Sequence, residues 1–186
     1  LINQILELSR LESGSLAIQW THGNIIPFIG YVVESFRSYA TTKSIGLHWV
    51  AEPKEVWMDY DAEKIQSILT NLIGNAIKYT PEGGAIMLKA GVHSDGRMFF
   101  EVSDNGVGMN AEELKKASSP FWRAGPDMSV GDVEGSGLGL AITTQLTALL
   151  GGTFEIESQK GEGTTARIWL PQSCRAYDQP SVTSFA

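Results

Sequence analysis

A glycine-rich run that opens a predicted helix could bind a phosphate group. Residues 135–140 read Gly-Ser-Gly-Leu-Gly-Leu. Glycine lets a backbone approach a ligand closely, and the first turn of a helix offers unpaired N–H groups to an anion. The G-x-G-x-G spacing differs from the dinucleotide-binding G-x-G-x-x-G, and the lysine of a P-loop is missing. Those two nucleotide motifs are excluded, while anion binding and close helix packing both stay open.

A second candidate is a row of polar side chains on the helix predicted over residues 61–79. Asn71, Asn75 and Tyr79 are spaced four residues apart along the flank of its apolar face. Lys78 lies beside that row. Asparagine is a poor residue for a helix interior, so two on one flank ask for a reason, although a solvated flank gives the same pattern.

A third candidate is the aspartate at the end of a predicted strand, in the run Asp-Asn-Gly-Val-Gly over residues 104–108. Asp104 shares its strand face with Phe100 and Val102, so its carboxyl is expected to be partly buried and to need a hydrogen-bond donor. The same letters are typical of a plain turn. Residues 161–164, Gly-Glu-Gly-Thr, predict by themselves a tight hairpin turn.

Hydrophobic periodicity predicts the elements that must position these residues. Helices are predicted over residues 1–14, 25–43, 61–79 and 138–150. Strands are predicted over residues 16–20, 46–51, 55–58, 86–92 and 97–103, followed by a hairpin over 152–170. The stretch 104–137 is irregular and too long for an ordinary connection, so a functional or mobile segment is expected there.

Composition excludes several classes of protein. The 186 residues include 21 acidic and 14 basic side chains, a net charge of −7, which argues against a nucleic-acid-binding surface. One cysteine cannot form an internal disulfide, and no apolar run approaches the length of a membrane span. Of the 20 glycines, five precede residue 83 and fifteen lie over 83–163, which indicates turns or close backbone approach in that part of the chain.

Taken together and in order, these motifs resemble the ATP-binding domain of sensor histidine kinases. That family belongs to the GHKL superfamily, with gyrase B, the Hsp90 chaperone and MutL. The matching segments are residues 72–81 (the N box), 104–109 (G1), 120–123 (the F box), 135–140 (G2) and 161–164 (G3). The resemblance covers roughly residues 1–171. It implies an α+β fold: a two-layer α/β sandwich of one mixed sheet and three helices, with a mobile ATP lid.

The resemblance implies ATP and Mg²⁺ as cofactors and assigns roles to the polar candidates. Asp104 would accept a hydrogen bond from the adenine exocyclic amine, the contact that selects ATP over GTP. Tyr79 would pack on the base, and the Asn75 amide oxygen would bind Mg²⁺. Lys78 and Arg123 would meet phosphate charge.

The family's glycine boxes contribute further cofactor-binding positions. These are Gly106, Gly108, Phe121, Gly135, Ser136, Gly137, Leu138, Gly139 and Thr164. Amides over 137–139 would cradle the phosphates, and the loop with Gly106 and Gly108 would close over the nucleotide. Phe121 would anchor the end of an ATP lid over about 110–134.

Position 71 separates kinases from hydrolases within the superfamily. The gyrase-type ATPases carry a glutamate there that activates water, whereas this chain has Asn71, an amide that cannot act as a base. The resemblance therefore implies transfer of the ATP γ-phosphoryl group to a protein histidine, with Asn71, Lys78 and Arg123 as the catalytic residues. A nucleotide-binding regulatory module without transfer, or a GHKL-type ATPase, is the alternative.

The acceptor histidine is the one departure from the family pattern. His22, His48 and His93 lack the His-Glu/Asp-x-x-x-Pro context of the family. Residues 1–15 resemble the C-terminal end of the dimerisation helix without that histidine, 16–171 the catalytic domain, and 172–186 a tail or linker.

The expected partners follow from the same resemblance. They are the histidine-bearing dimerisation domain of the same protein and a response-regulator receiver domain, with no nucleic acid. The parent protein is expected to be a homodimeric inner-membrane sensor, with this part in the cytoplasm and outside the membrane.

Overall fold

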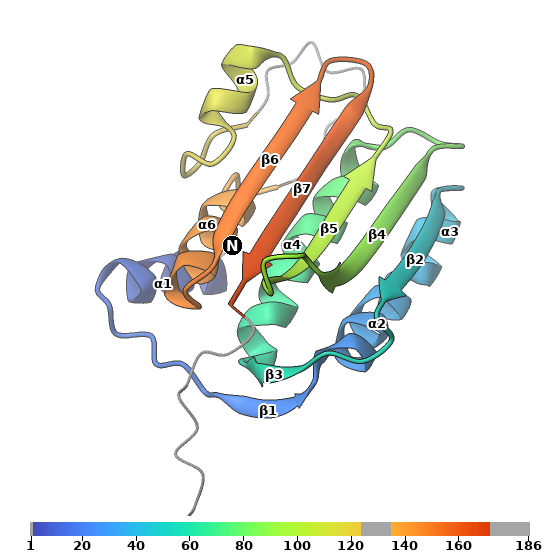
Figure 1. Cartoon of the computed structure of the whole chain (residues 1–186). Coiled ribbons are helices and arrows are strands. Elements are labelled where there is room, and N and C mark those ends of the chain that lie inside the picture. Colours follow the sequence, from blue (N-terminus) through green and yellow to red (C-terminus); the bar gives the residue numbers. More distant parts are fainter. Residues whose placement is uncertain (1, 124–134, 172–186) are drawn as a thin grey trace, which may run out of the picture.

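A mixed five-stranded sheet forms the centre of the fold. The computed structural model describes residues 2–123 and 135–171 (Figure 1). The strands are β2 (Gly46–Glu52), β4 (Ala85–Val92), β5 (Met98–Asp104), β6 (Thr153–Gln159) and β7 (Gly163–Leu170), in the order β2-β4-β5-β7-β6. The β2–β4 pair is parallel and the other three pairs are antiparallel.

Helices cover one face of this sheet (Figure 1). They are α2 (Ile25–Ser35), α4 (Ala62–Tyr79) and α6 (Gly139–Leu149), with α4 packed between the other two. The core between the layers is built from alternate strand residues, among them Leu47, Ile86, Leu88, Phe100, Val102 and Ile168. The predicted α+β sandwich of a mixed sheet and three helices is confirmed. Helix α1 (Ile2–Glu12) packs beside α6, and the short helix α3 (Arg37–Thr42) follows α2 in the chain.

A capping side chain sets the start of the central helix α4, and a proline sets its end. The Asp61 carboxylate accepts a hydrogen bond from the Lys64 backbone N–H over 3.1 Å, which caps the first turn. Thr80 is extended, as expected for a residue before Pro81, and the helix ends at Tyr79. One face of α4 is buried and carries Ile65, Ile68, Leu69, Leu72, Ile73, Ala76 and Ile77.

The strand predicted over residues 16–20 is wrong. Those residues have no strand partner, although the apolar side chains of Leu16, Ile18 and Trp20 pack against the core. The Gln19 backbone N–H donates instead to the Asp61 carboxylate over 2.7 Å. Pairing starts one residue later, where β1 (Thr21–Asn24) and β3 (Trp57–Tyr60) form a separate two-stranded sheet.

Two predicted boundaries also move. The helix predicted over 25–43 is broken at Phe36, where the backbone N–H donates to the Val33 carbonyl in a tighter turn, so that α2 and α3 are separate. The predicted strand 55–58 shifts to β3, because Val56 is bound by its backbone to Asn24 and Ile25.

The long irregular stretch contains one helix that periodicity does not reveal. Helix α5 (Ala111–Lys116) begins at Asn110, whose side chain accepts from the N–H groups of Glu112 and Glu113 in a capping box. Residues 124–134 of the predicted lid, and the tail 172–186, lie outside the described residues. Among the helices described, none is long and apolar enough to cross a bilayer.

Candidate functional site

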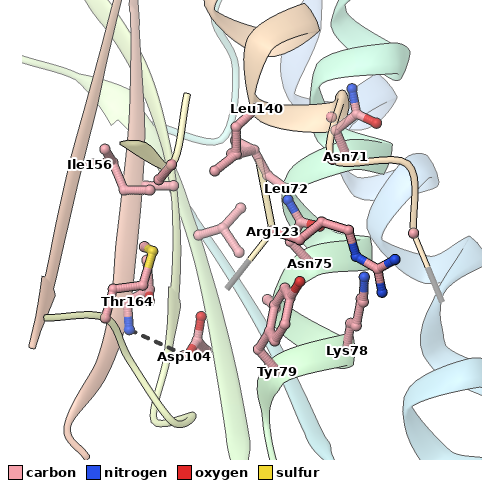
Figure 2. Close-up of a pocket in the computed structure, with 18 of the residues that line it drawn as sticks. Asn71, Leu72, Asn75, Lys78, Tyr79, Asp104, Arg123, Leu140, Ile156 and Thr164 are labelled. Atoms are coloured by element: carbon pink, nitrogen blue, oxygen red, sulfur yellow. Dashed lines mark hydrogen bonds between the residues drawn. The ribbon is translucent and has the colours of Figure 1, made fainter. Parts of the chain in front are cut away.

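A cleft of about 290 Å³ lies between α4, the start of α6 and the β5–β7 end of the sheet. Twelve of the predicted site residues line it: Asn71, Asn75, Lys78, Tyr79, Asp104, Gly108, Arg123, Gly135, Ser136, Gly137, Gly139 and Thr164. Figure 2 shows the wall formed by α4 opposite the strand residues. Side chains far apart in the sequence therefore meet in one cavity.

The α4 wall presents the predicted polar row to the cleft. Asn71, Asn75, Lys78 and Tyr79 all line it, and the Asn71 side chain lies against Gly139 at the start of α6. The Asn75 amide has no hydrogen bond to another residue in the described part of the chain, so its oxygen is available to a ligand or metal ion. The Lys78 Nζ lies 5.0 Å from the centroid of the Tyr79 ring.

Asp104 lies across the cleft from α4, at the end of β5. Its Oδ1 accepts from the backbone N–H of Gly106 over 2.8 Å and from that of Thr164 over 3.3 Å. Oδ2 accepts no hydrogen bond from the residues that the structure describes. Burial raises the pKa of Asp104, and the two backbone hydrogen bonds offset part of that rise. The site thus holds a fixed, partly buried carboxyl with one oxygen open to a ligand.

Two glycines near Asp104 are required by close approach between segments of the protein itself. A Cβ on Gly108, whose φ is +58°, would overlap the carbonyl oxygen of Gln159. A Cβ on Gly163, whose φ is +116°, would overlap the carbonyl oxygen of Asp104. The loop after β5 and the β6–β7 turn are therefore pressed together beneath the cleft. Gly106, in the same loop, packs instead against the Tyr79 carbonyl at the end of α4 and does not itself line the cleft.

The glycine run before α6 closes another side of the cleft. Gly135 lies beside the Lys78 ammonium group, and Gly137 with φ +70° packs on the backbone of Trp122. Leu138 is fully buried in the core and does not line the cleft. Its backbone N–H donates to the Ser136 hydroxyl over 3.2 Å. The first turn of α6 nonetheless points its N-terminus at the cavity, which is the geometry that favours an anion.

The two predicted phosphate-binding cations, Lys78 and Arg123, both line the cleft. Figure 2 shows the ends of the Lys78 and Arg123 side chains near one another, on the side of the cleft away from Asp104 and Thr164 in this view. An acceptor carboxyl at one side and two cations at the other suit an elongated ligand with a neutral donor group and an anionic end. This local arrangement explains how a chain of net charge −7 can bind an anion.

Phe121, the predicted lid anchor, does not line the cleft. Its side chain is 62 % exposed, and its φ of +62° is uncommon for a residue with a Cβ. The neighbouring Trp122 lines the cleft instead.

Several lining residues are not among the predicted ones. They are mostly apolar: Gln4, Leu72, Ala76, Val102, Val107, Met109, Ala117, Trp122, Leu140, Ile156 and Ala166. Met109 lies at the end of the glycine-containing run after Asp104. Its place in that run is the one sequence signal that could have identified Met109 as a lining residue. Gln4 reaches the cleft because α1 packs beside α6, and no sequence pattern predicts that contact.

The three histidines lie away from this cleft. His22 Nδ1 is 2.8 Å from the Asp59 carboxylate, His93 Nδ1 is 3.2 Å from Asp95, and His48 is exposed on β2. No group of three or more His, Cys, Asp or Glu side chains that could hold a metal occurs among the described residues.

Comparison with known proteins identifies the family of this site. The family model for histidine kinase-, DNA gyrase B- and HSP90-like ATPases matches residues 60–173. The chain is 32 % identical over 171 residues to the histidine protein kinase DivJ of Caulobacter vibrioides, covering 92 % of this chain and 28 % of DivJ. It is 35 % identical over 174 residues to the circadian input-output histidine kinase CikA of a Synechocystis species, covering 92 % of this chain and 23 % of CikA.

Solved structures agree with the fold. The full-length structure of ShkA in complex with AMPPNP matches with a TM-score of 0.79 at 27 % identity, over 91 % of this chain and 35 % of that one. The catalytic domain of the histidine kinase ThkA matches with a TM-score of 0.71 at 22 % identity, over 84 % of this chain and 97 % of that one, which shows the shared fold. The chain therefore belongs to the histidine kinase-, DNA gyrase B- and HSP90-like ATPase family, as an ATP-binding catalytic domain of the sensor histidine kinases.

Proposed function

We propose that this domain binds ATP with Mg²⁺ and transfers the γ-phosphoryl group to a histidine on the dimerisation domain of its parent protein. Asp104 carries this proposal: its carboxylate is fixed by two backbone N–H groups, and Oδ2 stays open toward the cleft. An acceptor there suits the amine of adenine and repels the oxygen that guanine carries at the same position. The AMPPNP complex of ShkA, a solved structure that is similar to this chain, supports an adenine nucleotide as the ligand.

The remaining binding roles follow from position in the cleft. The Tyr79 ring would pack on the adenine, and the Lys78 and Arg123 cations would neutralise phosphate charge. N–H groups of Gly137, Leu138 and Gly139 would bind phosphate oxygens once the Ser136 hydroxyl releases the Leu138 N–H. The Asn75 amide oxygen would bind Mg²⁺, which supplies charge neutralisation between the phosphates when bound.

The transfer itself requires positioning and charge neutralisation from this chain. A lone pair of the acceptor imidazole attacks the γ-phosphorus, the bond from that phosphorus to the β–γ bridging oxygen breaks, and ADP leaves with the negative charge. Asn71 lines the cleft at the α6 end but has no basic oxygen to activate water. Attack by an imidazole is therefore favoured over hydrolysis, because the imidazole is itself the nucleophile.

The organisation of the parent protein is part of the same proposal. The chain spans 28 % of the length of DivJ and 23 % of the length of CikA. We propose that residues 1–15 are the end of the dimerisation helix, 16–171 the catalytic domain and 172–186 a tail or linker. The proposed parent is a homodimeric inner-membrane sensor with this domain in the cytoplasm, which passes the phosphoryl group on to a response-regulator receiver domain.

A transfer assay tests the proposal. The domain is mixed with a separately produced histidine-bearing helix pair and ATP labelled at the γ-phosphorus, with Asp104→Asn as the matched variant. Acid-labile, base-stable label on the histidine is expected with the wild-type domain and should fall sharply with the variant. ATP binding without label would instead indicate a regulatory nucleotide-binding module. Steady release of phosphate by the domain alone would indicate an ATPase.

A further inference from the structure

Three polar side chains lie in register across three neighbouring strands at the Asp104 side of the cleft. Asp104 on β5 pairs with Thr164 on β7, and Thr164 pairs with Ser158 on β6. Asp104 and Thr164 line the cleft, and Ser158 is the next side chain outward along this row. Ser158 lies outside the five motif segments 72–81, 104–109, 120–123, 135–140 and 161–164.

The Ser158 hydroxyl has three hydrogen-bond partners. Its Oγ is 2.9 Å from the Gly163 carbonyl oxygen, 2.8 Å from the Met109 backbone N–H and 2.8 Å from the Thr164 hydroxyl. A carbonyl can only accept, so the single hydrogen of Ser158 is given to Gly163. A backbone N–H can only donate, so Met109 occupies one lone pair of Ser158. The remaining lone pair must then accept the hydrogen of the Thr164 hydroxyl.

This assignment decides which kind of hydrogen bond Thr164 offers to a ligand. With its hydrogen directed at Ser158, the Thr164 Oγ presents lone pairs alone to the cleft. The open Oδ2 of Asp104 likewise only accepts when the side chain is in its carboxylate form. The Asp104 and Thr164 side chains thus both accept hydrogen bonds from a ligand in this part of the cleft, and neither donates one.

We propose that Ser158 is a positioning residue that sets base selectivity, by orienting the Thr164 hydroxyl so that this part of the cleft accepts a purine amine and disfavours a purine oxygen. The inference rests on the proposed ATP-binding function and adds a residue that touches no ligand. The Ser158 hydroxyl also accepts a hydrogen bond from the backbone N–H of Met109, a residue that lines the cleft. Without Ser158 the Thr164 hydroxyl could rotate and donate to the oxygen of guanine.

The test compares ATP and GTP affinities of the intact domain by calorimetric titration. For Ser158→Ala, the ratio of GTP Kd to ATP Kd is expected to fall about fivefold or more. In the variant the Thr164 hydroxyl can donate to the guanine oxygen, so a repulsive contact between two acceptors becomes one hydrogen bond. Ser158→Thr keeps the hydroxyl and should keep the wild-type ratio. Ser103→Ala is the matched control, because Ser103 and Thr165 form the same kind of hydroxyl pair (2.9 Å) one position along β5 and β7, on the opposite face of the sheet.

The possible results separate this inference from the proposed function. An unchanged ratio in Ser158→Ala, including an equal loss of affinity for both nucleotides, overturns the role of Ser158 while ATP binding stands. Folded wild-type domain that binds no ATP overturns the proposed function itself. If Ser158→Ala is unfolded at the assay temperature, Thr164→Val removes the same acceptor, and an unchanged ratio in that variant equally contradicts the inference.

Discussion

The backbone N–H of Thr164 donates to the Asp104 carboxylate over 3.3 Å, joining residues that face each other across β5 and β7. The Gly106 N–H holds the same oxygen from the other side. The carboxylate is thus oriented by the sheet and by the loop that follows it, and its free oxygen points to the cleft without help from a ligand. Preorganisation of this kind strengthens binding because less ordering is left for the bound state.

Replacing this carboxylate by an amide should weaken ATP binding severely. Asp104→Asn keeps the shape of the side chain but loses the charged acceptor, and hydrogen bonds to charged groups contribute about 1.5–3 kcal/mol, so ATP affinity should fall about tenfold or more. Calorimetric titration with ATP-Mg²⁺ measures the effect. Asp59→Asn is the control, since Asp59 is also a buried strand carboxyl but pairs with His22 away from the cleft. Equal affinity of wild type and Asp104→Asn would contradict the adenine assignment.

The raised pKa of Asp104 makes the contribution of this one carboxyl to the stability of the free domain fall as the pH rises. The folded state binds a proton at Asp104 more tightly than the unfolded state, because burial disfavours the charged form. Between the ordinary aspartate pKa and the raised value, the folded state therefore holds more protons, and the contribution of Asp104 to stability falls as the pH increases through that range. Urea unfolding at pH 3.5–7 should show Asp104→Asn gaining stability relative to wild type with increasing pH. A constant difference would show that Asp104 titrates alike in both states.

A methyl group at Gly108 should separate the loop after β5 from the β6–β7 turn. Both Gly108 and Gly96 have positive φ, so alanine at either position costs about 1–2 kcal/mol of backbone strain. A Cβ at Gly96 meets no atom within 4 Å, whereas one at Gly108 overlaps the Gln159 carbonyl. Gly108→Ala should therefore lower the free energy of unfolding by more than Gly96→Ala does, and only Gly108→Ala should weaken ATP binding. Equal losses in the two variants would argue against the overlap.

The buried ion pair at the start of α4 should contribute more to stability than an exposed ion pair does. Lys64 Nζ lies 2.7 Å from the Asp61 Oδ2, and both side chains are almost fully buried. Burial acts to raise the pKa of Asp61, but its hydrogen bonds from Lys64 and from the Gln19 backbone outweigh that effect and lower the pKa. Asp61→Ala leaves a buried ammonium group unpaired and uncaps α4, so a loss of about 3–5 kcal/mol is expected in urea unfolding.

The exposed pair of Glu34 and Arg37 serves as the comparison for Asp61. Glu34→Gln breaks an ion pair between two half-exposed side chains, and little change in stability is expected because solvent screens such charges. A loss in Asp61→Ala no larger than that in Glu34→Gln would show that the Asp61–Lys64 pair does not hold the start of α4.

Asn75→Ala should remove the dependence of ATP binding on Mg²⁺. The wild-type domain is expected to bind ATP more tightly with Mg²⁺ than in a chelator, because the amide oxygen of Asn75 would bind the ion. In the variant the two affinities should approach each other, while binding in the chelator persists. An undiminished Mg²⁺ effect would place the ion's protein ligand elsewhere.

Local sequence determined most of the elements and the identity of the polar wall. The apolar spacing over 61–79, the Asp61 cap and Pro81 define α4, and the same spacing decides that Asn71, Asn75 and Tyr79 share one side of it. These signals are local, so they can be interpreted without knowing the fold. The order of five short motifs likewise predicted the family, because motif order along a chain needs no coordinates.

Tertiary structure alone decided which strands pair, why the glycines near Asp104 are required, and which side chains meet across the sheet. Residues 16–20 alternate like a strand but find no partner, because a strand exists only where another backbone offers a ladder. The glycines near Asp104 suggested approach to a ligand, yet Gly108 and Gly163 are required by contact with Gln159 and Asp104. The register across β5, β7 and β6 sets Asp104, Thr164 and Ser158 in one row. Such long-range pairing depends on which strands become neighbours, and a linear pattern does not contain that information.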